Sequence, residues 1–303
     1  MPLPTFAPQA TIGGLPLAVG IVSTNDAVWV LAHSSATLAR IDPATNQTTD
    51  EIRVAREFAN GLAPVAGLLW TFDQTDGVVV GVDPVKRKVA FRIKAGHDGD
   101  VFAAGDGALW LLSGSDLIRV DPVAASVAST VGIPTGCSGA LLVAGGYAWI
   151  GEGGHLCKVE EATGKRVGGL DGGAGTGWGM AWDGSGILAP TEDGGVVRID
   201  PAGPAVDAVI PPPAPGTFEG AQYSLGLPGD VAFIGPDSTG AWVRYNGATG
   251  ARLELRGAAP EWILYAGLEP GVEGLPIVEA HGSLWIGAPD SGTVSRMAVP
   301  SAP

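Results

Sequence analysis

One short pattern recurs along the chain at nearly equal intervals, and it limits the fold more than any other feature does. An apolar stretch that usually holds a tryptophan precedes a segment similar to "TLARIDPATNQ" (37–47). The tryptophan position is occupied in turn by Trp29, Trp70, Trp110, Trp149, Ile187, Phe233 and Trp285. The intervals between these residues are 41, 40, 39, 38, 46 and 52 positions. The chain is therefore built from seven units of similar design.

Each unit divides into four short β patterns separated by turn residues. In the first unit, strands are predicted at 17–22, 27–32, 37–42 and 47–54. A period near 40 residues with several short strands in each unit is typical of β-propeller blades. The Asp-Pro pair after the third strand suits a turn, because Pro fixes φ and the Asp side chain can accept a backbone hydrogen bond. We expect the repeated tryptophans to pack between neighbouring blades rather than to bind a ligand.

The two ends of the chain predict how the ring is joined. The last unit supplies only three strands, at 275–280, 283–288 and 293–299, while a spare strand at 9–12 precedes the first unit. We expect this spare strand to complete the seventh blade, because joining the ends removes exposed strand edges. The predicted fold is an all-β, seven-bladed β-propeller of four-stranded antiparallel blades, formed by residues 1–303 as a single domain.

Composition and charge restrict the partners. The chain has 46% hydrophobic and 16% charged residues, with 48 Gly and 24 Pro, which favours a large core and many tight turns. The formal charge of −14 makes nucleic acid and anionic membranes poor partners and attracts cations. No uninterrupted apolar stretch is long enough to span a bilayer. We expect a soluble monomer.

The two cysteines leave two alternatives. Cys137 and Cys157 are either two buried thiols or a disulfide. We predict the disulfide, within the fourth blade, which requires the segment around Cys137 to fold across the top of that blade. A disulfide indicates a mature secreted or periplasmic protein, whereas free thiols indicate a cytoplasmic one.

The repeat also resembles a known group of proteins. Tryptophan strands followed by "TLARIDPATN" look like those of the YVTN-type and virginiamycin B lyase-like propellers. The resemblance covers nearly the whole chain and implies the propeller fold. Lyases of this family use metal-assisted elimination, with histidines at the starts of inner strands in late blades. The matching starts here, "AQYSLG" (221–226) and "GLPIVE" (274–279), contain no histidine, so the resemblance does not extend to those ligands.

Acidic turns suggest a site on one face of the ring. The turns between second and third strands lie on the same face as the connections between blades, which we call the top face, and six of the seven contain a carboxylate. Asp is an ordinary turn residue, so each carboxylate could simply bond its own backbone. Alternatively, Glu152, Glu192 and Asp193 form a metal site for Ca²⁺ or Mg²⁺, since hard cations need several oxygen ligands.

Long connections add aromatic residues to the same face. Segments 173–182, 211–223 and 256–276 carry Trp178, Tyr223 and Trp262, which form either a plug or a lid over an acidic floor. The further expected ligand contacts are His97, Asp237 and Asp290.

Two functions fit these features, and whether the protein is an enzyme stays open. The first is a binding or scaffold module whose top face takes a cationic ligand, a metal or a protein partner. The second is a metal-assisted lyase or hydrolase at the mouth of the central channel. Its catalytic candidates are Glu152, Glu192 and His155, with His155 as the base.

Overall fold

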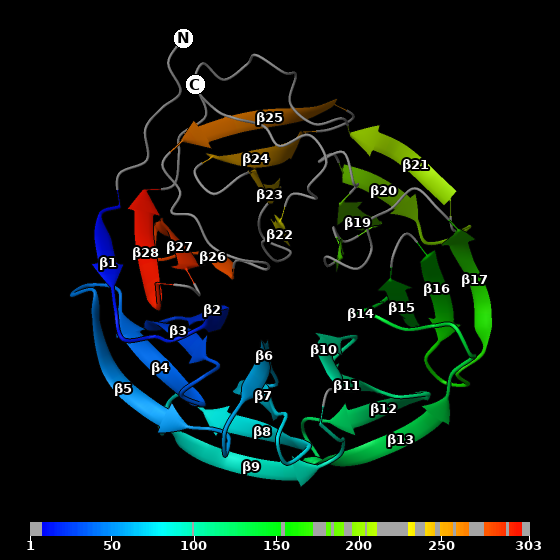
Figure 1. Cartoon of the computed structure of the whole chain (residues 1–303), viewed down its shortest axis with the longest axis horizontal. Helices are drawn as coiled ribbons and strands as arrows, with labels where there is room; N and C mark the ends of the chain where they lie inside the picture. The colour runs from blue at the N-terminus through cyan, green and yellow to red at the C-terminus, as the bar shows by residue number, and fades with distance from the viewer. Residues whose placement is uncertain are drawn as a thin grey trace.

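The architecture is a ring of small β-sheets. The computed structural model describes residues 8–98, 100–152, 155–171, 180–182, 185–190, 196–203, 205–210, 230–233, 240–245, 249–256, 259–266, 276–288 and 291–298. All regular elements in these ranges are β-strands, and they form seven four-stranded antiparallel sheets. Figure 1 shows the sheets around a common centre, with the first strand of each nearest to it. This is the propeller architecture that the repeat predicts.

We number the sheets as blades in chain order. Blade 1 comprises β2 (Ala18–Thr24), β3 (Ala27–Ala32), β4 (Thr37–Asp42) and β5 (Gln47–Arg53). Blade 2 comprises β6 (Ala59–Val65), β7 (Leu68–Asp73), β8 (Val78–Asp83) and β9 (Lys88–Lys94). Blade 3 comprises β10 (Val101–Gly105), β11 (Ala108–Ser113), β12 (Asp116–Asp121) and β13 (Ser126–Gly132). Blade 4 comprises β14 (Ala140–Ala144), β15 (Tyr147–Glu152), β16 (His155–Glu160) and β17 (Arg166–Asp171).

The remaining blades follow the same order. Blade 5 comprises β18 (Ala181–Trp182), β19 (Ile187–Pro190), β20 (Val196–Asp200) and β21 (Ala205–Ile210). Blade 6 comprises β22 (Asp230–Phe233), β23 (Gly240–Tyr245), β24 (Thr249–Arg256) and β25 (Ala259–Ala266). Blade 7 comprises β26 (Ile277–Ala280), β27 (Ser283–Ala288), β28 (Thr293–Ala298) and β1 (Ala10–Ile12).

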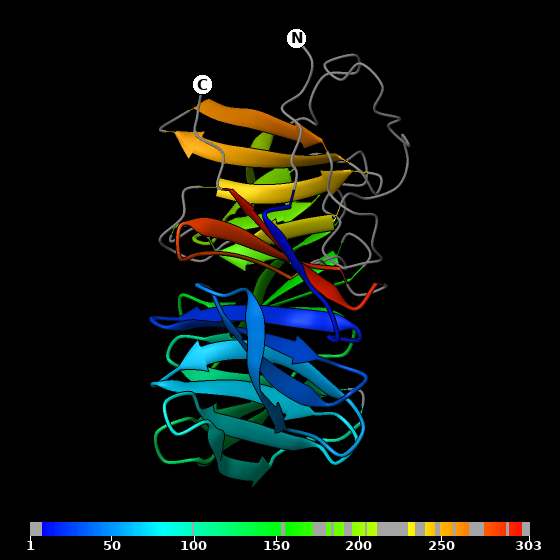
Figure 2. The ribbon, with the colours of Figure 1, turned by 90° about the vertical axis from the view of Figure 1, so that its left-hand side faces the viewer.

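Blade 7 contains strands from both ends of the chain. β1 pairs antiparallel with β28, with Ala10 opposite Arg296 and Ile12 opposite Val294. Figure 2 shows β1 lying beside β28. The backbone N–H of Leu15 also donates to the carbonyl of Gly292 at 2.9 Å. The segment at 9–12 thus lies at the position that counting strands predicts for it.

The repeated tryptophans form the core between blades. Trp29, Trp70, Trp110, Trp149 and Trp285 are all buried, and each lies in an apolar cluster shared with the following blade. Four of their indole N–H groups donate to the backbone carbonyl five residues earlier, and that of Trp29 donates to the Thr24 hydroxyl. Each ring is therefore fixed by packing and by its polar end, which confirms the expected structural role.

Two kinds of turn explain the regular strand lengths. The turns between first and second strands at 66–67, 106–107, 145–146 and 281–282 have two residues, both with positive φ, which matches the twist of a hairpin. After the third strand, the predicted Asp contacts occur in blades 1, 2, 3 and 5. Asp42, Asp83, Asp121 and Asp200 each accept backbone N–H bonds of 2.7 to 3.0 Å. His281 lies in one of the turns between first and second strands.

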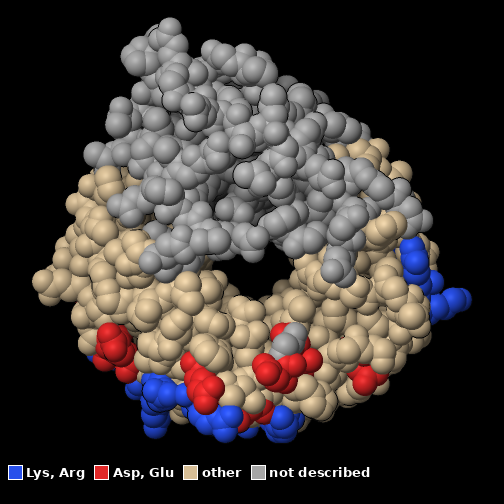
Figure 3. Space-filling model, in the orientation of Figure 1, with Lys and Arg blue, Asp and Glu red and all other residues tan. Residues whose placement is uncertain are grey.

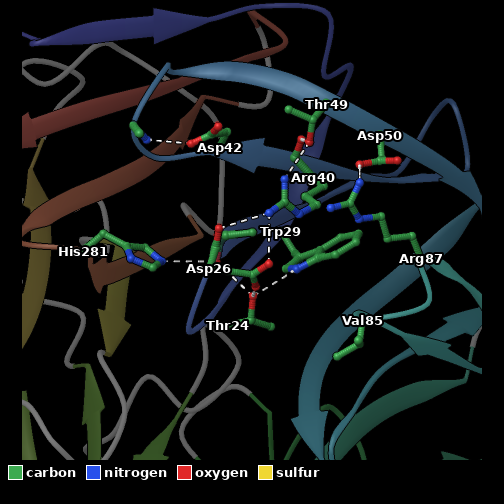
Figure 4. A network of polar contacts seen from close by, with 12 residues as sticks. Thr24, Asp26, Trp29, Arg40, Asp42, Thr49, Asp50, Val85, Arg87 and His281 are labelled. Atoms are coloured by element: carbon green, nitrogen blue, oxygen red, sulfur yellow. Dashed lines mark hydrogen bonds and ion pairs between the residues drawn. The ribbon is translucent and has the colours of Figure 1, made fainter.

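The Arg of the repeat is structural, as Figure 4 shows for blade 1. Arg40 is almost fully buried and donates to Asp26 Oδ2 at 3.0 Å and to Thr49 Oγ1 at 2.8 Å. The register shifts between Arg40 and Ile41. The extra residue of this bulge is Thr49 on β5, and β4 itself keeps its alternation, with Leu38 in the apolar cluster shared with blade 2 and Ile41 in the cluster shared with blade 7.

The prediction for blade 6 is wrong in its details. The place of Phe233 in the tryptophan series predicted that its strand, at 231–236, is the second of blade 6, and 256–276 was expected to be a connection over the top face. Instead β22 is the first strand of its sheet, and β25 is the outermost strand, paired along its length with β24. The apolar and aromatic run 262–265 explains the change, because such residues favour strands.

Candidate functional site

The top face is formed by the connections between blades together with the turns between second and third strands, as the strand order predicts. In blades 1 to 4, each connection between blades contacts the turn between second and third strands of a neighbour. The carbonyl of Phe58 accepts a bond from Gln74 N at 3.1 Å, and the N–H of Ile133 donates to the Ser115 carbonyl at 2.7 Å. The polar residues of the two segment types therefore lie close together in this part of the ring.

The acidic turn of blade 2 satisfies the protein's own backbone. Asp73 is buried, and its carboxylate accepts bonds from Arg56 N and Asp76 N, both at 3.2 Å. Asp76 lies 3.5 Å from the Arg56 guanidinium. In this blade the carboxylates behave as turn residues, so the surface charge that a bound cation would need is partly neutralised.

The two histidines of the first blades are held differently. His33 stacks on Phe58 with ring centroids 5.1 Å apart, and its Nδ1 lies 2.7 Å from the carbonyl oxygen of Ala59. His97 is exposed, and its Nδ1 lies 3.1 Å from Ser113 Oγ. The imidazole of His33 therefore packs against its neighbours, whereas that of His97 is accessible to solvent.

Among the described residues, no carboxylate orients the His97 ring toward Ser113 as the third member of a catalytic triad would. Asp100 is buried beside this pair, but its Oδ2 accepts the backbone N–H of His97 at 2.6 Å. The carboxylate therefore fixes the loop rather than the imidazole. A base needs its other ring nitrogen oriented to activate a hydroxyl efficiently, so this arrangement fits ligand contact better than nucleophilic catalysis.

The turn of blade 4 brings two candidates opposite each other. Glu152 ends β15 and His155 begins β16, and the two residues are direct partners in the antiparallel register. Of Glu152 the structure describes the backbone alone. His155 is exposed. The register therefore places these two candidate residues at the two ends of one turn.

A disulfide supports this turn. Cys137 and Cys157 are joined with an S–S distance of 2.11 Å and a Cα–Cα distance of 5.7 Å, which confirms the predicted pairing. Both are buried in a cluster with Trp110 and Ile150. The bond ties the connection between blades 3 and 4 to β16, two residues beyond His155.

The other predicted site residues are not placed by the structure. Trp178, Glu192, Asp193, Tyr223, Asp237 and Asp290 lie outside the described residues, and Trp262 lies in β25, where only the backbone is described. Within the described ranges, no group of three or more His, Cys, Asp or Glu residues could hold a metal ion.

A carboxyl pair on the opposite face was not foreseen. Asp106 of the β10–β11 turn and Glu161 of the β16–β17 turn share a hydrogen bond, and Asp106 Oδ2 also accepts Gly146 N at 2.6 Å. Burial, then the bond and charge of Asp106, raise the pKa of Glu161 from 4.5 to about 7. Glu161 Oε1 is buried and has no hydrogen-bond partner in the described structure. The adjacent acids of "VEEATG" are the only hint that the sequence gives.

These features define a β-propeller with a polar top face, and solved structures share the fold. The chain in Kuenenia stuttgartiensis hydrazine synthase aligns with a TM-score of 0.67 at 14% identity, covering 94% of this chain and 96% of that one. A streptogramin B lyase aligns with a TM-score of 0.65 at 12% identity, covering 94% of both chains. The Myceliophteria thermophila Cps50 (Swd1) β-propeller domain aligns with a TM-score of 0.67 at 13% identity, covering 97% of this chain and 100% of that domain.

At these identities the likeness establishes the fold, which agrees with the resemblance in the repeats. No protein-family model and no curated protein sequence matches the chain. In the described part of the chain, no helix is long and apolar enough to cross a membrane.

Proposed function

We propose that the chain is a single-domain propeller module that binds a cationic ligand or a divalent metal on its top face, at blades 4 and 5. The observation that carries this proposal is the turn of blade 4, where Glu152 and His155 are register partners beside a disulfide. Glu192 and Asp193, in the corresponding turn of blade 5, add two carboxylates from the neighbouring blade. Carboxylate oxygens are the ligands that Ca²⁺ and Mg²⁺ prefer.

The other predicted contacts complete the pocket in this proposal. Trp178 covers the ligand, Tyr223 lines it, and His97, Asp237 and Asp290 lie around its rim. Trp262 is left out of this pocket, because β25 is the outermost strand of blade 6. The aromatic rings would form the walls of the pocket, and their faces attract organic cations. The protein acts as a monomer in an oxidising compartment, which the buried disulfide favours.

Titration calorimetry tests the proposal with Ca²⁺, Mg²⁺, Mn²⁺ and a panel of amines. Wild type should bind one of them with a Kd below about 1 mM. Glu152→Gln combined with Glu192→Gln should weaken that binding at least about tenfold, since each variant removes one charged ligand. Asp76→Asn is the matched control on the same face, because Asp76 already pairs with Arg56. Equal binding by the double variant and the control would refute the site.

A metal-assisted lyase or hydrolase is the second candidate, favoured by the fold likeness to a streptogramin B lyase. In this function, His155 removes a proton while the carboxylates of Glu152 and Glu192 hold the metal. Mass spectrometry after incubation with a streptogramin B and Mg²⁺ distinguishes the two functions. A linearised product that disappears in His155→Ala favours the enzyme, whereas metal binding without product favours the binding module.

A further inference from the structure

The segment from the end of β5 through blade 2 is basic, although the chain as a whole is acidic. Residues 53–94, which include all of blade 2, hold seven of the 17 Lys and Arg residues and four of the 31 Asp and Glu residues. Their formal charge is therefore +3, while the rest of the chain carries −17. Figure 3 shows Lys and Arg side chains along the rim of the ring where Figure 1 draws β9, with some Asp and Glu beside them.

The charge lies on a free strand edge. β9 is the outermost strand of blade 2 and pairs only with β8 within the described structure, so one row of its backbone groups faces outward. Its sequence "KVAFRIK" carries three cations and no carboxylate. The outer strands β5, β13 and β17 each have a net charge of zero or below. β9 is thus unlike the other described edges.

Arg92 and Lys94 lie on the same side of β9 and bond to backbone carbonyls rather than to carboxylates. Arg92 and Lys94 are opposite Val80 and Val78 in the register, so they lie on the same side of β9. Arg92 donates to the carbonyl of Val54 at 3.1 Å and Lys94 to that of Gly96 at 3.0 Å. Because carbonyl oxygens carry no net charge, these bonds fix the side chains without neutralising them.

The turn before β9 extends the surface. Val85 is 87% exposed, and Lys86 and Arg87 are exposed beside it. Lys86 pairs with Asp83 at 3.0 Å and Arg87 with Asp50 at 3.2 Å, the latter drawn in Figure 4. Phe91 is 41% exposed and stacks on Trp70 with centroids 6.2 Å apart. A rigid aromatic and an exposed valine therefore accompany the charge.

We propose that the outer edge of blade 2 binds an extended acidic segment of a partner protein, which adds a fifth strand beside β9. A strand laid along this edge would place alternate residues opposite Arg92 and Lys94, so acidic residues two positions apart would meet both cations. The free N–H and C=O groups of β9 supply the backbone bonds. Nucleic acid fits less well, because Asp50 and Asp83 lie among the cations and would repel a continuous row of phosphates.

Fluorescence anisotropy with a labelled peptide of alternating Glu and Val tests this inference. The peptide should bind with a Kd of about 10–100 µM at low salt and several-fold more weakly at high salt, since the ion pairs are exposed. Arg92→Glu with Lys94→Glu should weaken binding at least about tenfold. A second variant, Lys86→Glu with Lys88→Glu, changes only the turn and the first residue of β9. It should also weaken binding, and it replaces the first variant if Arg92→Glu with Lys94→Glu disturbs folding.

Matched controls separate strand addition from general charge attraction. Lys165→Glu with Arg166→Glu makes the same charge change at blade 4, where both residues are exposed, and should leave the affinity within about twofold. A peptide with alternate backbone amides methylated should lose binding, because it cannot form a ladder. The inference is overturned if the blade 2 and blade 4 variants behave alike or if the methylated peptide binds equally. It is also overturned if only heparin or an oligonucleotide binds, or if sedimentation shows a second copy as the occupant.

Discussion

Neutralising Glu161 should change how stability depends on pH. Burial, and then the neighbouring Asp106, raise the pKa of this carboxyl in the folded protein from the ordinary 4.5 to about 7. Below pH 4.5 the group is protonated in both the folded and the unfolded chain. Between 4.5 and 7 only the folded chain keeps the proton, so the free energy of unfolding falls as pH rises. Above pH 7 the loss is complete.

The size of the effect follows from the shift. The difference between the pKa of Glu161 in the folded chain and its pKa in the unfolded chain corresponds to at most about 3 kcal/mol in the free energy of unfolding. Glu161 is only partly buried, so water screens the repulsion and we expect about 1–2 kcal/mol. Glu161→Gln imitates the protonated form and should match wild type at about pH 5. At about pH 8 it should be more stable by that 1–2 kcal/mol, or about 2–4 °C in Tm.

Thermal unfolding followed by tryptophan fluorescence at both pH values measures this difference. The lowered pKa values of Asp26, Asp83 and Asp121 act below pH 4 and do not enter the comparison. Asp106→Asn keeps an acceptor for Gly146 N–H, tolerates the positive φ and should also reduce the loss. Glu51→Gln, an exposed change on β5, is the control and should follow wild type. Parallel curves for wild type and Glu161→Gln would refute the reasoning.

Three further changes test the packing and the turns. Trp70→Ala should cost about 3–5 kcal/mol, because it empties a buried site between blades 2 and 3, and a Tm within about 2 °C of wild type would contradict this. Ala125 has φ 51°, so Ala125→Gly should raise stability by about 0.5–1 kcal/mol while Ala124→Gly should not; both are measured by thermal unfolding. Replacing Cys137 and Cys157 by Ser releases a loop with a sequence separation of 20 and should cost about 3 kcal/mol; equal urea midpoints for both proteins would count against it.

Most strands could be located from the repeat because every unit needs buried apolar strands separated by tight turns. The strands at 27–32 and 37–42 match β3 and β4 at both ends, since buried apolar residues and turn residues alternate sharply there. Blade 6 was misassigned because its copy is degenerate: Phe233 replaces the tryptophan, and the spacing is irregular. Where the periodicity weakens, the apolar run that became β25 could not be distinguished from a lid.

The polar sites were harder to predict because they depend on contacts between distant residues. Asp106 and Glu161 are far apart in sequence, and only the packing of blades 3 and 4 joins them. The disulfide was predicted because Cys137 comes just before the first strand of the fourth blade and Cys157 lies in its third strand. Reasoning from a net charge of −14 overlooked the basic triplet at 86–88, since a total hides local concentration. The ligand contacts expected at blades 4 and 5 remain predictions.

The pairing of β1 with β28 sets the order in which the protein can be completed during synthesis. Ile12 leaves the ribosome about 280 residues before its partner Val294, an interval of roughly 15–55 s at ordinary translation rates. Blade 1 can form during that time, but β1 cannot pair within blade 7 until β28 has been made. Of the described strands, β1 is the first to be synthesised and is therefore among the last to find its partner.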